Sequence, residues 1–209
     1  MNDAKTKLGF DGEELVVFKK LDSPRKIQDF LEKIPINFEK DGKDTCVSPR
    51  RMLQRNKAHC IEGALFAAAA LWLNGERPFL LDLQSADHDL DHVVTLFCRC
   101  RLWGAISKTN HTVLRYREPI FRTVRELALS YFHEYFTDKG EKTMRSYSRP
   151  FNLLRFAKPG WAISEKNLWY IADALDASPH YPVLSKTALA NLRPADPIEI
   201  KAGKLVRWK

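Results

Sequence analysis

The run from Cys60 to Leu73 is small or apolar nearly all round and is followed by Asn74 and Gly75. A helix of that composition has no polar face for solvent, so it must be buried against a sheet or between layers. Gly75 fits the position just after a helix end, and Pro78 stops the helix. The run is shorter than the roughly 20 residues that a membrane span needs. The sequence therefore predicts a short helix inside a globular core.

Strand patterns follow this helix. Residues 79–83 are mostly apolar and read as a strand, residues 93–97 form a β-branched and aromatic strand, and 102–106 reads as a return strand after a turn at 99–101. Other apolar patterns predict a short strand at 15–18, helices over 23–34, 120–136 and 164–175, and a terminal hairpin over 198–208.

These elements predict an α+β fold in which the helix from Cys60 to Leu73 packs on a small antiparallel sheet with flanking helices. We expect one domain over 1–209, because a chain of this length can form a single core. Within it, residues 1–22 are an N-terminal arm, 45–136 the core, and 137–209 an extension packed on the core.

The charge pattern bears on partners and location. The net charge is +8, and all of the excess lies in residues 51–209. Basic and acidic side chains alternate without long runs of one sign, which favours a solvated mixed surface over a nucleic-acid footprint. The N-terminus has no signal-peptide segment, so we expect a cytoplasmic protein with no membrane partner and with reduced cysteines.

Cys60 is the candidate nucleophile. The first turn of a helix favours an anion, which lowers the pKa of a thiol placed there, and Lys57 and His59 act in the same direction. The alternative is an inert cysteine packed in the core. His92, at the start of a predicted strand, is the candidate base. A third group that orients its ring would come from the return strand, where Ser107 and Asn110 are the candidates.

Three motifs carry a resemblance to a known family. They are Lys57-Ala-His-Cys-Ile-Glu-Gly-Ala64, Asp91-His-Val-Val94 and Trp103-Gly-Ala-Ile-Ser-Lys-Thr-Asn110. A cysteine that opens a small-residue helix, followed by a histidine at a strand start and a tryptophan-containing return strand, resembles the transglutaminase-like core of the papain-like cysteine enzymes.

The resemblance implies a cysteine hydrolase or acyltransferase that acts on a peptide, amide or thioester substrate. Its intermediate would be an acyl-thioenzyme, and no cofactor or metal would be needed. Gln54, six residues before Cys60, would be a side-chain donor to the oxyanion, beside the backbone N–H of Cys60.

The sequence also departs from the family pattern. The position four residues after Trp103, where the family usually has an aspartate, is Ser107, and Val93 and Val94 replace an aromatic residue. Asn110 could take the place of the aspartate only if the strand bends, since in a regular strand it points away from the face of Ser107.

Other functions remain open at this stage. The missing aspartate allows a catalytically inactive binding module, and the basic C-terminal half allows nucleic-acid binding. His88 and His92 stand four residues apart, as in zinc hydrolases, but that motif requires a helix and the segment favours a strand.

Overall fold

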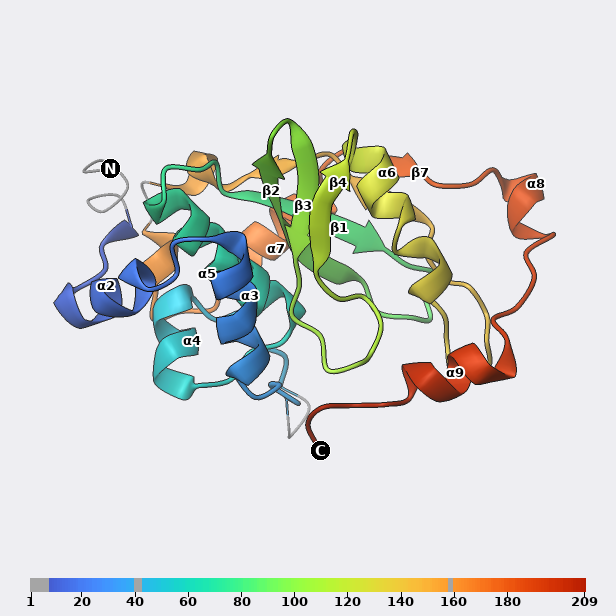
Figure 1. Ribbon diagram of the computed structural model, residues 1–209, viewed down its shortest axis with the longest axis horizontal. Helices are drawn as coiled ribbons and strands as arrows, with labels where there is room; N and C mark the ends of the chain where they lie inside the picture. The colour runs from blue at the N-terminus through green and yellow to red at the C-terminus, as the bar shows by residue number, and fades with distance from the viewer. Residues whose placement is uncertain (1–7, 40–42, 158–159) are drawn as a thin grey trace.

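The computed structural model describes residues 8–39, 43–157 and 160–209, which form an α+β fold around a seven-stranded antiparallel sheet (Figure 1). The strands are β1 (Phe79–Gln84), β2 (His92–Arg99), β3 (Leu102–Ile106), β4 (Arg117–Phe121), β5 (Ser146–Ser148), β6 (Phe151–Asn152) and β7 (His180–Pro182). The helices are α2 (Gly12–Lys19), α3 (Pro24–Lys33), α4 (Pro49–Arg55), α5 (Cys60–Leu73), α6 (Val124–Leu129), α7 (Trp169–Asp176), α8 (Lys186–Leu189) and α9 (Pro197–Gly203), with 3-10 turns η1 (Phe132–Glu134), η2 (Leu153–Phe156) and η3 (Trp161–Ile163).

The sheet has the order β4-β3-β2-β1-β5-β7, and β6 also pairs with β1. The predicted hairpin between β2 and β3 is confirmed, with Thr95 opposite Ile106 and Arg99 opposite Leu102. Its two turn residues, Cys100 and Arg101, have φ values of 51° and 67°. Positive φ at both central residues is the pattern of a type I′ turn, whose twist suits a hairpin.

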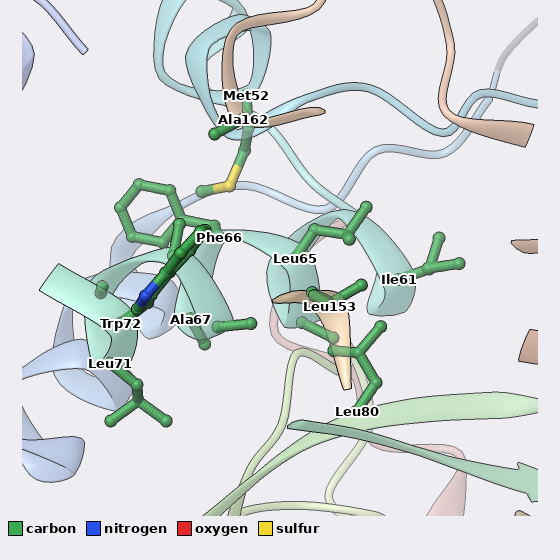
Figure 2. Close-up of a cluster of buried hydrophobic side chains, with 14 of the residues drawn as sticks. Met52, Ile61, Leu65, Phe66, Ala67, Leu71, Trp72, Leu80, Leu153 and Ala162 are labelled. Carbon is green, nitrogen blue, oxygen red and sulfur yellow. The ribbon is translucent and has the colours of Figure 1, made fainter. Parts of the chain in front are cut away.

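Helix α5 spans the predicted residues and is buried from Ile61 to Leu73. Figure 2 shows its side chains Leu65 and Phe66 packed among Met52, Leu80 and Leu153. The Thr95 hydroxyl on β2 donates a hydrogen bond of 2.6 Å to the Ala64 carbonyl, which ties the first turns of the helix to the sheet.

The opposite face of the sheet carries a second core. Leu81, Leu83 and Val94 pack there with Leu127 of α6 and Tyr131. The alternation of Leu80 and Leu81 between the two cores follows from the two-residue period of a strand. Both faces of the central strands are therefore buried.

Three predicted elements differ in type or extent because of a local cap, and a fourth, the helix predicted over 164–175, begins later than predicted. Residues 12–19 form α2 instead of a strand, because Asp11 and Glu14 make a capping box at its start. The same device, between Asp196 and Glu199, makes α9 a helix where a hairpin was predicted.

The predicted helix over 120–136 is divided in the structure. Strand β4 runs to Phe121, Thr123 caps a new helix, and α6 ends at Leu129 before η1 begins. Helix α7 begins at Trp169, later than the predicted residue 164. The predicted helix over 23–34 is confirmed as α3, with Ser23 as its N-cap and Pro24 in its first turn.

Within the described ranges, no helix combines the length and the apolar composition that crossing a bilayer would require.

Replacing Leu80 with alanine tests the packing of α5 on the sheet. Leu80 is fully buried, so Leu80→Ala should lower the free energy of unfolding by about 2–5 kcal/mol, through lost burial and the cavity left behind. Urea denaturation measures this. Leu90→Ala is the control, because Leu90 is 85% exposed and its loss should change stability by less than about 0.5 kcal/mol. Equal effects of the two variants would contradict the described core.

Candidate functional site

Cys60 is the first residue of α5, directly after the N-cap residue His59. Its half-buried thiol interacts with the imidazoles of both His59 and His92. Burial by itself raises the pKa of the thiol, but the hydrogen bonds and positive charges of His59 and His92 outweigh it and lower the pKa to about 5. A cysteine with that pKa is a thiolate at neutral pH, which is the nucleophilic form.

His92 is oriented by Ser107. The Nε2 atom of His92 lies 2.8 Å from the Ser107 hydroxyl oxygen, and that hydroxyl donates its one proton to the Leu114 carbonyl at 2.5 Å. Ser107 must therefore accept from His92, so Nε2 carries the ring proton and Nδ1 is the nitrogen left to interact with the Cys60 thiol. Ser107 thus occupies the orienting position that the sequence offered to either Ser107 or Asn110.

His59 supplies positive charge next to the thiol. Its Nε2 atom lies 2.7 Å from the Thr45 carbonyl oxygen, 3.2 Å from a Glu39 carboxylate oxygen and 3.5 Å from one of Glu62. Burial lowers the pKa of this imidazole, but the interactions with Cys60, Glu62 and Thr45 prevail and raise it to about 9. At neutral pH the pair is a thiolate beside an imidazolium.

Glu62 anchors the loop above the helix start, a function that the sequence analysis missed. This fully buried carboxylate accepts hydrogen bonds from the Thr45 hydroxyl at 2.7 Å, from the Val47 N–H at 3.1 Å and from the His59 N–H at 3.1 Å. A glutamate three residues after an N-cap is the signal that could have identified it.

Gly63 allows the end of β3 to approach α5. A Cβ atom at this position would lie 2.5 Å from the Cβ of Lys108, so only glycine fits without a shift. The buried Lys108 ammonium in turn donates to the Leu31 carbonyl at 2.9 Å and to that of Ile34, at the end of α3. This contact holds Ser107, the neighbour of Lys108, close to the first turn of α5.

A pocket of about 390 Å³ opens beside the thiol, and both Cys60 and His92 line it. Its walls include apolar side chains from the loop after α3, from the segment after η1 and from α9, namely Ile36, Phe38, Phe136 and Ile200. Figure 1 shows the chain after α9 running below the β3–β4 loop, where the Thr112 N–H donates to the Leu205 carbonyl at 3.2 Å. The Cys60 thiol and the His92 imidazole therefore face a space that a small molecule could enter.

Asn110 and Gln54, which were predicted as site residues, are not positioned for the roles predicted for them. Asn110 lines the pocket, but its side-chain amide is bonded to the Trp208 backbone at 3.0 Å and 2.8 Å, and His92 is bonded to Ser107 instead. The role of ring orientation proposed for Asn110 is corrected accordingly. Gln54 is exposed on α4 and is not among the residues that line the pocket, so this position does not support the oxyanion role predicted for it.

The alternative zinc motif lacks its helix. His88 lies in a turn and pairs with Glu141 at 3.1 Å, whereas His92 begins β2. Across the described part of the chain, no group of three or more histidine, cysteine, aspartate or glutamate side chains is arranged to hold a metal ion.

Two comparisons of the sequence with known proteins found no match. No protein-family model matches the sequence, and no curated protein matches it either. The chemistry of the site is therefore argued from its own groups: a thiolate, an oriented imidazole, an imidazolium and an adjoining pocket.

Gly63→Ala tests whether close approach at α5 sets the site geometry. The added methyl group would force Lys108 and the neighbouring Ser107 away from Cys60, so alkylation of the thiol at pH 6 should slow by about tenfold or more. Gly12→Ala is the matched control, because a Cβ there meets nothing within 4 Å. Mass spectrometry of Cys60 after timed iodoacetamide treatment measures the rate, and equal rates in the two variants would contradict the contact.

The pH dependence of alkylation tests the thiolate. Because only the thiolate reacts, the rate at Cys60 should be near its plateau at pH 7 and fall as pH drops through about 5. Cys60→Ala should abolish this labelling, whereas Cys46→Ala should preserve it, since burial raises the pKa of Cys46 to about 12. Slow labelling of Cys60 that rises only above pH 8 would refute an activated thiol.

Proposed function

We propose that this protein is a cysteine-dependent hydrolase or acyltransferase acting on a peptide, amide or thioester bond. Cys60 is the nucleophile and His92 the general base and acid. The observation that carries the proposal is that the Cys60 thiol and the His92 imidazole, which is hydrogen-bonded to Ser107, line the same pocket. Nucleophilic catalysis by cysteine requires this combination of an ionisable thiol, an oriented base and access for a carbonyl group.

The proposed reaction has two stages. The Cys60 thiolate attacks the substrate carbonyl carbon while Nδ1 of His92 holds the proton that the thiol has given up. The carbon–nitrogen or carbon–sulfur bond then breaks, and the leaving group takes the proton from His92. Water or another nucleophile attacks the acyl-thioenzyme and gives its proton to His92, and the bond to the Cys60 sulfur breaks to release the acyl product and restore the thiolate.

Other groups support these steps. Ser107 keeps Nδ1 of His92 available for the thiol, and the His59 imidazolium offsets the negative charge of the thiolate. The backbone N–H of Cys60 lies in the first turn of α5, where helix N–H groups have no partner in the helix, and we assign it as a donor to the oxyanion.

The order of elements supports a transglutaminase-like arrangement of this core. A cysteine begins a buried helix, β1 follows, a histidine begins β2, and the orienting residue comes just after β3. Ser107 stands where that family usually has an aspartate. In this proposal a hydroxyl bonded onward to the Leu114 carbonyl orients the ring in place of a carboxylate.

Intact-mass spectrometry with small acyl donors tests the function. A panel of acyl thioesters, p-nitrophenyl esters and short peptide amides should leave an acyl group on wild-type Cys60. Cys60→Ala should give no adduct at this site, and His92→Gln should slow acylation by about 10²–10⁴-fold. Cys46→Ala is the control and should acylate normally.

The alternative is a binding module with the same scaffold and no catalysis. It predicts that Cys60 is alkylated at low pH but accepts an acyl group from no donor in the panel. That result would overturn the proposed reaction while leaving the thiolate intact.

A further inference from the structure

The backbone of Ser107 is held by a side chain distant in sequence. Ser107 comes directly after β3, beyond the last paired residue Ile106. The Gln28 side chain on α3 takes the place of a neighbouring strand: its Nε2 donates to the Ser107 carbonyl at 2.8 Å, and its Oε1 accepts from the Ser107 N–H at 3.0 Å. Ser107, whose side chain orients His92, therefore has its backbone held by hydrogen bonds from a side chain of α3.

The Gln28 amide can adopt only one orientation in this position. Its oxygen faces an N–H donor, and its two N–H groups are taken by the Ser107 carbonyl and by a Glu32 carboxylate oxygen at 2.8 Å. A flipped amide would place donor against donor and acceptor against acceptor. Because Gln28 is only 7% exposed, such mismatches would be costly, which fixes the clamp.

Glu32 is fixed in turn by ion pairs with Arg115 and Arg207. Arg115 follows Leu114, whose carbonyl accepts the Ser107 proton. Two things determine the position of the Ser107 hydroxyl: the Ser107 backbone and the Leu114 carbonyl that accepts its proton. Gln28 holds the first, and Glu32 holds Arg115, the neighbour of the second, so one network fixes both.

We propose that Gln28 is a positioning residue for the His92 base: by clamping the backbone of Ser107, it holds the hydroxyl that keeps His92 in its productive tautomer. This inference rests on the proposed function for the role of His92. Gln28 touches neither the thiol nor the pocket in this scheme and acts only through Ser107. Loss of the clamp would let Ser107 move, and the ring would lose the acceptor that fixes its Nε2 proton.

The test measures how the rate of Cys60 alkylation by iodoacetamide depends on pH, because this readout needs no substrate. Gln28→Met has similar length and no hydrogen-bonding groups. Its half-maximal pH should rise by about one unit from the wild-type value of about 5, so the rate at pH 6 should fall by about twofold. Gln28→Asn keeps the amide but is too short for both contacts, so it should show the same direction of change if the methionine variant does not fold.

Two controls separate positioning from general stability. Ile27→Val removes a buried methyl group from the same helix without touching Ser107, and its pH profile should overlay that of the wild type. Ser107→Ala should reproduce the shift, and the double variant Gln28→Met/Ser107→Ala should show no further shift, because both changes remove one interaction.

A Gln28→Met profile that overlays the wild type, or shifts no more than Ile27→Val, would overturn the positioning role. Additive shifts in the double variant would do the same. The acyl-donor panel reports separately on the proposed function. Wild-type protein that forms no acyl adduct but shows the Gln28-dependent shift would refute the reaction and leave the positioning role standing.

Discussion

The burial of α5 is the constraint on which the rest of the structure depends. A helix with no polar face must be covered on every side, and the sheet, α3 and α4 provide that cover. Only its first residue remains half-buried, which places the Cys60 thiol at the edge of the core. The close approach at Gly63 then brings the end of β3 to this edge, so the packing that stabilises the fold also assembles the site.

Much of this arrangement follows from apolar patterns along the chain. The approximate limits of α5, β1 and the β2–β3 hairpin were predictable because apolar, small or β-branched side chains predominate along each of them. The helix predicted over 120–136 failed because a local signal, the Thr123 cap, begins a new element inside an apparently continuous pattern. Periodicity identifies a buried face better than it locates the ends of elements.

The candidate site was predictable where its chemistry is local. A cysteine at a helix start and a histidine at a strand start are visible in sequence, and the structure brings them together. Gln28 is 79 residues from Ser107, so no local spacing could reveal the contact. Which of Ser107 and Asn110 orients His92 was likewise not predictable locally, because the Asn110 amide is hydrogen-bonded to the backbone of Trp208, 98 residues away.

A carboxylate beside a histidine can both orient the ring and bring negative charge, whereas Ser107 does only the first. The hydroxyl orients the His92 ring but brings no negative charge, since its proton goes to a backbone carbonyl. The carboxylates of Glu39 and Glu62 lie instead around His59, where they favour the imidazolium that offsets the thiolate. In the proposed reaction, orientation is therefore supplied at His92 and charge at His59, and an aspartate at position 107 is not required for either.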